Sequence, residues 1–236
     1  MAVLFDAAST ANGEAITSLS WTHTPVGTPT AVGVGISWWS GSDAISTITY
    51  GGAAMTLEAS DVDAIEGPRA SIYGKANPAP GAQTISISWG AASVYPVGGA
   101  LTVTGSDTSD TFSNNATANG NEVTPNATAS ATTTSATNEL VMDTVVCMHS
   151  TGTSTITVGA GQTQRWNASA GTAVNLKGGG STEVGAASVT MSWTVTNTEN
   201  VYGWAIVAAS FRLAAPAATD GTGSGNRRIY LPFGKH

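Results

Sequence analysis

The sequence has little charge, a single cysteine and no long apolar run. Lys, Arg, Asp and Glu make up 10% of its 236 residues, whereas 41% of the residues are hydrophobic. Disordered chains combine low hydrophobicity with high charge, so this composition predicts a folded protein whose surface carries hydroxyl and amide groups. The lone Cys147 excludes an intramolecular disulfide and the usual multi-cysteine metal sites. Its apolar neighbours predict a small, buried side chain.

Signals for export and for membrane insertion are also missing. No segment reaches the roughly 18 consecutive apolar residues of a membrane span. Residues 1–6 have neither the basic nor the apolar region of a secretory signal. We therefore expect the chain to fold in the cytoplasm of the cell that makes it.

The charge is unevenly distributed along the chain. All fifteen acidic residues precede Asn226, together with only five of the eight basic residues, which gives this part a net charge of −10. The last ten residues hold the other three bases. An acidic body argues against nucleic acids and anionic membranes as its partners.

One strand pattern occurs twice. Residues 80–89 and 185–193 both alternate small or apolar residues with Ser or Thr and end on Trp. Because side chains on a strand alternate between faces, we expect Val189, Met191 and Trp193 to share one buried face. Residues 46–52 are echoed in the same way by residues 154–160. These repeats predict an all-β fold, an antiparallel β-sandwich built from two echoing halves.

The same reasoning places the individual elements. No window has the 3.6-residue period of a helix. Residues 31–39 are apolar on both faces and predict a central strand whose glycines permit close packing. Residues 58–66 are interpreted as an acidic loop, residues 178–181 as a flexible connection, and residues 106–137 as a strand with a long loop, with a linker as the alternative. The expected strands are residues 3–5, 15–24, 31–39, 45–50, 54–57, 70–75, the segment ending at Trp89, 97–103, 139–148, 154–158, 162–166, 173–177, the segment ending at Trp193, and 204–213.

The expected domain organisation has two parts. Residues 1–213 form one β-sandwich domain, with echoing halves at about residues 1–105 and 139–213. Residues 214–236 form a flexible spacer and a C-terminal docking tail.

Several segments resemble a known module. Residues 50–57, 159–166 and 185–193, the last followed by residues 204–213, are similar to a Gly/Ser/Thr-rich, jelly-roll-like β-sandwich module. That module recurs in tailed-phage structural proteins, as decoration or fibre-like parts, and in bacterial surface proteins. The resemblance covers about residues 1–213. It implies that the two halves combine in one jelly-roll-like sandwich, and it implies no catalytic residues.

The residues that could carry catalysis or bind a metal form no complete motif. Nucleophilic catalysis needs a base beside a nucleophile, and the histidines are only three: His23, His149 and His236. Acidic residues gather in one segment and could hold a hard cation such as Ca²⁺, but they lack the full spacing of a known calcium loop; they are Glu58, Asp61, Asp63 and Glu66. The glycines at 178–180 have no Lys and no following helix to bind a phosphate. We expect no enzyme, no metal and no cofactor.

The tryptophans and the tail are the remaining candidates for binding. Most Trp residues occupy strand positions where core packing is expected, although Trp38 and Trp39 must point to opposite faces, and one exposed ring could stack on a sugar. After the spacer, an apolar segment is flanked by bases, and it could add an edge strand or fill a pocket on an acidic neighbour. The alternative is a disordered or expression-derived tail. The predicted partner-binding residues are Arg227, Arg228, Ile229, Tyr230, Leu231, Phe233 and Lys235.

The function expected from the sequence is a non-enzymatic structural protein of a virion. The chain would be a phage head decoration or fibre-like subunit on the virion surface. Its partners would be further copies of itself, as a homotrimer or similar, and a capsid or other virion protein. A carbohydrate-binding adhesin module and a subunit of an extracellular filament, either one at the cell surface or outside the cell, are the alternatives.

Overall fold

The computed structural model describes residues 1–39, 44–63, 67–90, 94–121, 126–149, 154–170, 175–197 and 201–216. Within these ranges the chain forms antiparallel β-strands and no helix. Accordingly, the described part contains no helix that is long and apolar enough to cross a membrane. The predicted all-β, antiparallel sandwich fold is confirmed.

The first half of the chain forms two sheets. The first inner sheet has the strand order β1-β9-β3-β7-β6, and the first outer sheet has the order β2-β8-β4-β5. The strands are β1 (Leu4–Asn12), β2 (Ser18–His23), β3 (Ala31–Trp39), β4 (Ile45–Tyr50), β5 (Ala53–Ala54), β6 (Thr56–Val62), β7 (Pro68–Ala76), β8 (Gln83–Trp89) and β9 (Tyr95–Thr104).

The second half repeats this arrangement strand for strand. The second inner sheet has the order β10-β17-β12-β15-β14, and the second outer sheet has the order β11-β16-β13. Only the two-residue β5 has no counterpart. The strands are β10 (Phe112–Gly120), β11 (Asn126–Thr133), β12 (Leu140–His149), β13 (Ser154–Val158), β14 (Thr163–Ser169), β15 (Asn175–Val184), β16 (Val189–Asn197) and β17 (Val201–Phe211).

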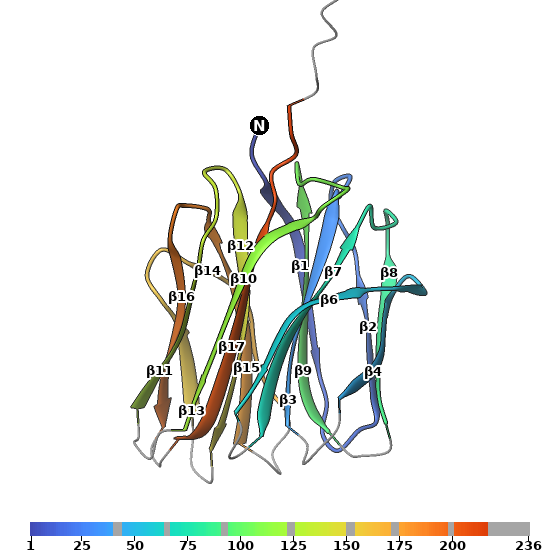
Figure 1. Cartoon of the computed structure of the whole chain (residues 1–236). Helices are drawn as coiled ribbons and strands as arrows, with labels where there is room; N and C mark the ends of the chain where they lie inside the picture. Colours follow the sequence, from blue (N-terminus) through green and yellow to red (C-terminus); the bar gives the residue numbers. More distant parts are fainter. Residues whose placement is uncertain are drawn as a thin grey trace, which may run out of the picture.

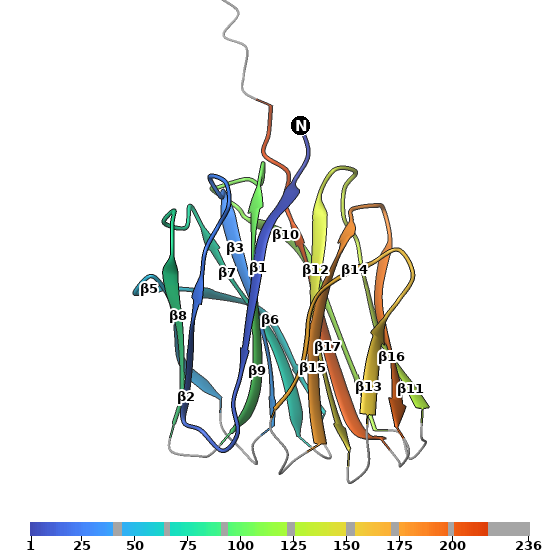
Figure 2. The same ribbon diagram turned by 180° about the vertical axis from the view of Figure 1, so that it is seen from behind.

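The four sheets lie side by side as four layers, with the two inner sheets facing each other (Figures 1 and 2). Each neighbouring pair of sheets encloses its own hydrophobic core. The resemblance implied a single sandwich to which both halves contribute. Instead, each half builds its own pair of sheets, and a third core joins the halves because both faces of each inner sheet are apolar.

The repeated strands bury the residues that their alternation predicts. Val189, Met191 and Trp193 are all buried in the core between the second inner and outer sheets, whereas Thr190 is exposed. On β8, the corresponding alternation buries Ile85, Ile87 and Trp89. The expected face of each repeat is therefore confirmed.

Glycines allow the two inner sheets to pack around one tryptophan. Trp166 is buried in the central core, and a Cβ atom added at Gly99 or Gly180 would overlap its indole ring. A Cβ atom at Gly35 would lie 2.9 Å from the same ring. The three glycines therefore leave space for the indole ring, and a side chain at any of these positions would occupy that space. The predicted close approach at the glycines of residues 31–39 is confirmed.

Three sequence interpretations are corrected. Residues 178–181 are no flexible connection: they lie in the middle of β15 and are buried, because Gly178 packs against Val97 of the first inner sheet and Gly180 packs against Trp166 of the neighbouring strand β14. The acidic loop expected at 58–66 is largely strand, since β6 extends to Val62. Within residues 106–137, where one strand and a long loop were expected, there are two strands, β10 and β11.

Candidate binding groove

A groove lies on the outer face of β6 and β7 because the first outer sheet does not extend over them. That sheet has three full strands and the two-residue β5, whereas the first inner sheet has five strands. Its core covers side chains of β3 and β9 and reaches β7 only at Tyr73. Side chains on the outer face of β6 and β7 therefore stand beside β4, the last full strand of the outer sheet.

The groove consists of two adjoining hollows. One has a volume of about 320 Å³ and the other about 280 Å³, and they share Ile45 and Tyr73. We call them together the β4–β7 groove. The larger hollow is lined by Trp38, Ala44, Ile45, Leu57, Ser60, Asp61, Val62, Arg69, Ser71 and Tyr73. The smaller one is lined by Ile45, Ser46, Thr47, Ile48, Thr49, Ala54, Met55 and Tyr73.

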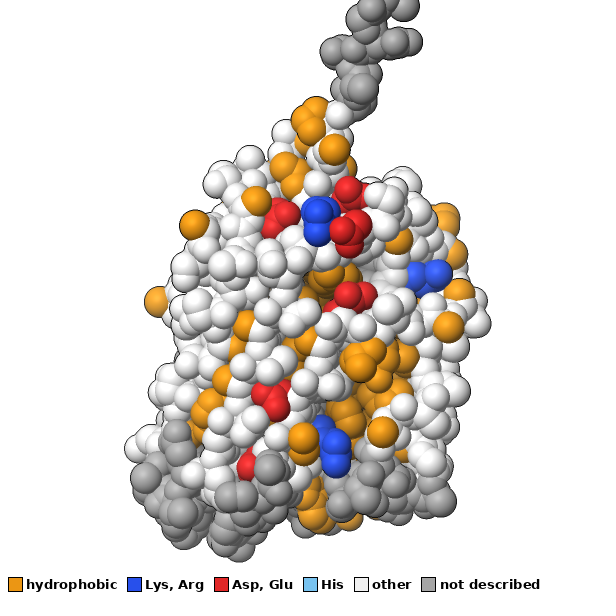
Figure 3. All heavy atoms as spheres, viewed as in Figure 1, with side chains coloured by type: hydrophobic (Ala, Val, Ile, Leu, Met, Phe, Trp, Pro, Cys, Tyr) orange, Lys and Arg blue, Asp and Glu red, His pale blue; other side chains and the backbone are white. Residues whose placement is uncertain are grey.

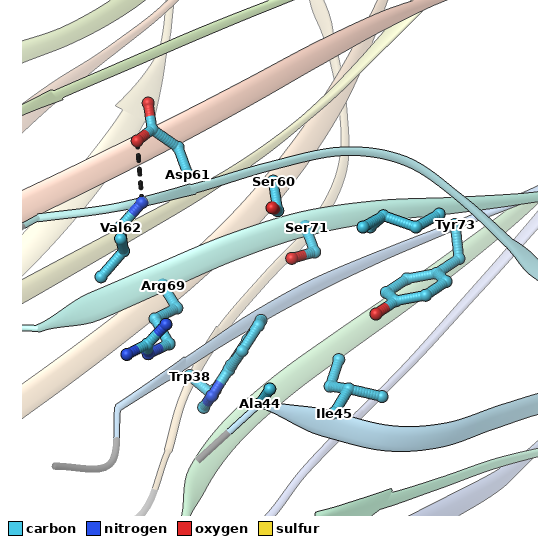
Figure 4. Close-up of a pocket in the computed structure, with 10 residues that line it drawn as sticks. Trp38, Ala44, Ile45, Ser60, Asp61, Val62, Arg69, Ser71 and Tyr73 are labelled. Carbon is cyan, nitrogen blue, oxygen red and sulfur yellow. Dashed lines mark hydrogen bonds between the residues drawn. The ribbon is translucent and has the colours of Figure 1, made fainter. Parts of the chain in front are cut away.

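The larger hollow has both polar and apolar groups at each end. Figure 4 shows Arg69 and Trp38 on one side of it, Tyr73 and Ile45 on the other, and the hydroxyls of Ser60 and Ser71 between them. The space-filling view shows hydrophobic side chains gathered over β6 and β7, with a basic side chain next to them (Figure 3).

The guanidinium of Arg69 is the one basic group among the described residues that line the larger hollow. The Nε atom of Arg69 is buried and has no hydrogen-bond partner within the described part of the chain. A buried donor without a partner costs about 1–3 kcal/mol, so a ligand oxygen that reached Nε would recover that energy. At the other end of the hollow, the hydroxyl of Tyr73 is a neutral hydrogen-bond donor. Burial raises the pKa of this phenol further above neutral pH.

Hydrogen bonds cross the corresponding place in the second half. There, Asn167 of β14 donates from Nδ2 to the backbone carbonyl of Ile156 on β13, at 3.0 Å. Gln162 donates to the Ser181 hydroxyl on β15 at 2.6 Å and accepts from the Ser192 backbone N–H on β16 at 2.8 Å. These bonds tie the edge of the second outer sheet to the second inner sheet. No such bond links β4 to β6 or β7 among the described residues of the first half, where the groove remains open.

A further hollow lies at the seam between the halves. It has a volume of about 300 Å³ and includes Glu58, Lys75, Asp110 and Phe112. Burial, and then the charge of Asp110, raise the pKa of the Glu58 carboxyl. Asp110 itself pairs with Arg212, at 2.9 Å.

The three histidines do not form a catalytic site in the described residues. His23 is fully buried, with Nδ1 2.8 Å from the Ser9 hydroxyl and Nε2 3.2 Å from the Thr102 hydroxyl. Thr102 donates its own hydrogen to the Asp6 carboxylate at 2.7 Å. Since Thr102 must then accept from His23, Nε2 carries the proton and Nδ1 accepts from Ser9. His23 lines none of the three hollows described above. His149 lies at the end of β12, in a position where its side chain is not described, and His236 lies outside the described residues.

The acidic residues proposed as a calcium loop are separated by the strand. Asp61 accepts from Asn119 of β10 at 2.9 Å, while Asp63 is buried and Glu66 lies outside the described residues. No group of three or more His, Cys, Asp or Glu residues suited to a metal ion occurs in the described part. Asp61, together with the bond from Asn115 Nδ2 to the Glu58 carbonyl at 3.2 Å, fastens β6 to β10 instead.

The tryptophans are committed to packing. Trp38, Trp89, Trp166, Trp193 and Trp204 are buried, and Trp21 and Trp39 are partly buried. Trp39 packs against Tyr95, with ring centroids 5.9 Å apart. Neither ring of the Trp38–Trp39 pair is exposed, and Trp38 is the one that lines the larger hollow.

Sequence reasoning did not find the groove. Tyr73 belongs to the strand expected at residues 70–75, whereas Arg69 lies just before it and is included only in the observed β7. Nothing local distinguishes either residue. The only available signal was an Arg beside an expected strand in a chain with few bases. The predicted partner-binding residues, Arg227 to Lys235, lie outside the described residues.

Comparisons with known proteins give no further indication. The chain matches no protein-family model, no curated protein and no solved structure.

Proposed function

We propose that the chain is a non-enzymatic structural protein of a virion, a head decoration or fibre-like subunit exposed on the particle surface. In this role it binds further copies of itself, as a trimer or similar assembly, and a capsid or other virion protein. The proposal extends the sequence resemblance, and the body contributes a rigid four-layer scaffold.

The observation that carries the proposal is the use of the buried titratable groups. His23 is held by Ser9 and Thr102, as described above. Asp143 is fully buried and accepts hydrogen bonds from Ser181, Trp193 and Gln162. A general acid or base must reach a substrate, whereas these two groups hold strands together. The use of His23 and Asp143 in hydrogen bonds between strands supports a structural role for the protein.

The tail supplies the assembly contact in this proposal. The described body ends at residue 216, and the spacer residues 217–226 could span up to about 33 Å when extended, at roughly 3.3 Å per residue. The apolar residues Ile229, Tyr230, Leu231 and Phe233 would dock on a neighbour, while Arg227, Arg228 and Lys235 would meet its acidic surface.

The test compares the full chain with a chain lacking residues 227–236. We expect the deletion to abolish self-association or attachment to particles, measured by light scattering after size exclusion and by co-sedimentation, without lowering the melting temperature of the body. A matched control deletes ten spacer residues, 217–226, and keeps the tail. Association that persists without residues 227–236 would rule out the tail contact, and locating the protein by electron microscopy on intact particles would test the virion role itself.

A carbohydrate-binding adhesin module is the second candidate. The observation that favours it is the open β4–β7 groove, which the following subsection develops. A filament subunit is distinguished from both by whether the purified protein forms open polymers.

A further inference from the structure

We propose that the β4–β7 groove binds an acidic sugar residue, with the carboxylate of the sugar held by the guanidinium of Arg69. This inference goes beyond the structural role and does not depend on it. It rests on the state of Arg69, the shape of the groove, the mixture of groups that line it, and the hydrogen bonds that cross its counterpart in the second half.

Arg69 differs from the other arginines in the described residues. Arg165 donates from Nε to Thr182 at 2.9 Å and lies 3.5 Å from the centroid of the Phe5 ring, and Arg212 pairs with Asp110. Within the described residues Arg69 makes no ion pair or cation–π contact of this kind, and its Nε, like that of Arg212, is buried without a hydrogen-bond partner, although the chain has almost twice as many acidic as basic residues. A guanidinium presents a planar set of donors that matches a carboxylate. The ligand group that fits this position is therefore a carboxylate.

The volume of the groove fits small rings. Ligand pockets have volumes of roughly 300–1,000 Å³, and the larger hollow, at about 320 Å³, lies at the lower end of that range. The second hollow, of about 280 Å³, adjoins it through Ile45 and Tyr73. Two adjoining hollows of this size suit two consecutive sugar rings, with the acidic ring next to Arg69.

The lining also combines the two kinds of surface that a sugar ring presents. Ser60, Ser71 and Tyr73 offer hydroxyl groups, and Ile45, Leu57 and Trp38 offer apolar surface. Leu57 is 49% exposed, a large value for a leucine. Side-chain hydroxyls can donate to or accept from ring hydroxyls, while apolar side chains cover the C–H groups of the ring.

A peptide strand and a phosphate fit the groove less well. Strand addition needs a row of free backbone groups, but the end of β4 already pairs with β5, and Ile48 O accepts from Met55 N at 3.2 Å. Phosphate sites use helix N-termini or nests of backbone N–H groups. Here one guanidinium faces the hollow from a strand, with Asp61 in the same lining.

The test measures binding of sugar acids to the whole chain. Ligand-observed NMR and calorimetry with glucuronic acid and N-acetylneuraminic acid should show saturable binding, in the millimolar range for single residues. Glucose, N-acetylglucosamine and acetate are the comparison ligands, and each should bind at least about tenfold more weakly, a loss of ~1.4 kcal/mol.

Two variants of equal charge change locate the site. Arg69→Met should weaken binding of the sugar acid at least about tenfold, and Arg69→Lys should weaken it less. Lys75→Met lies on the same strand but outside the groove, and it should leave the affinity within about twofold. Circular dichroism and melting curves establish that each variant is folded, and Tyr73→Phe offers a second probe of the groove if Arg69→Met does not fold.

Several outcomes would overturn the proposal. It fails if no sugar acid binds saturably, if neutral and acidic sugars bind equally, or if Lys75→Met weakens binding as much as Arg69→Met does. Acetate binding as tightly as the sugar acids would assign the groove to carboxylates in general. Competition by a peptide of residues 227–236 would assign it to the tail of a neighbouring copy.

Discussion

The indole N–H of Trp193 donates a hydrogen bond of 2.8 Å to the buried carboxylate of Asp143. This bond joins β16 of the second outer sheet to β12 of the second inner sheet. Asp143 also accepts from the Ser181 backbone N–H and hydroxyl, at 2.6 and 2.9 Å, and from Gln162 at 3.3 Å. Four donors and no acceptor therefore surround one carboxylate in the core.

The pH dependence of stability should report the burial of Asp143. Burial raises its pKa, the hydrogen bonds lower it, and the result is a pKa of about 6. Because the folded pKa exceeds the unfolded one, the contribution of Asp143 is fully favourable below about pH 4 and is lost as the pH rises through 6. The loss is about 3 kcal/mol. Urea unfolding at pH 4, 5, 6 and 7 measures it.

The control for this prediction is Asp143→Asn. The amide cannot ionise, so the difference in unfolding free energy between the natural protein and the variant should change across pH 4–7. The variant should still be less stable at pH 7, by about 1–3 kcal/mol, because the amide N–H₂ would face donors. An equal pH slope in both proteins would show that Asp143 is not responsible.

The contribution of His23 to the pH dependence of stability should have the opposite sign to that of Asp143. Burial lowers its pKa, and the charge of Asp6 offsets this in part. Since the folded pKa lies below the unfolded one, the stabilisation is present above about pH 6.5 and is lost as the pH falls. Asp6 and Tyr50 are the titratable groups that face His23. NMR titration of the imidazole should show a midpoint below the usual value, and His23→Gln should remove this part of the acid destabilisation.

Packing around Trp166 should not tolerate a single added methyl group. Gly180→Ala places a Cβ atom inside the volume of the indole, and overpacking of this kind costs about 1–3 kcal/mol or more. Combining it with Trp166→Phe should cost less than the sum of the two single changes, because the smaller ring vacates the space. Thermal unfolding of the three variants provides the measurement, and strict additivity would contradict the assigned contact.

Cys147 should be inert in the folded protein. It is fully buried on β12, and burial raises the pKa of its thiol. Only the thiolate reacts with disulfide reagents. We expect no reaction with a colorimetric thiol reagent under native conditions and complete reaction of one thiol in denaturant. Rapid labelling of the native protein would contradict the assigned burial.

Alternation identified the elements whose two faces differ in polarity. Residues 45–50 and 154–158 match β4 and β13, and the buried face of β16 follows from Val189, Met191 and Trp193. Residues 31–39, which match β3, were found from a continuous apolar run instead. In β1, by contrast, only residues 3–5 were expected to form a strand, although the strand continues to Asn12. Residues 6–12 are small or polar, and they pair with β9 because the sheet offers backbone partners, which local propensity does not record.

The layer order and the groove depend on contacts between distant residues. Gly178–Gly180 looks like a turn by composition, and only the position of Trp166 on a neighbouring strand explains why glycines fill a buried strand. Arg69 becomes notable only because the last full strand of the outer sheet, β4, leaves the outer face of β7 uncovered. Neither the packing of Trp166 on these glycines nor the uncovered outer face of β7 at Arg69 produces a recognisable pattern within one segment of the sequence. The candidate site therefore could not be predicted from the sequence.

The matching strand order of the two halves has a consequence for their independence. Each inner sheet is hydrophobic on both sides, and one of those sides is covered only by the other half. An isolated half would expose that side to water and would be driven to pair with a second molecule. Joining the two halves in one polypeptide therefore covers both apolar sides within a single molecule, so the halves depend on each other for stability.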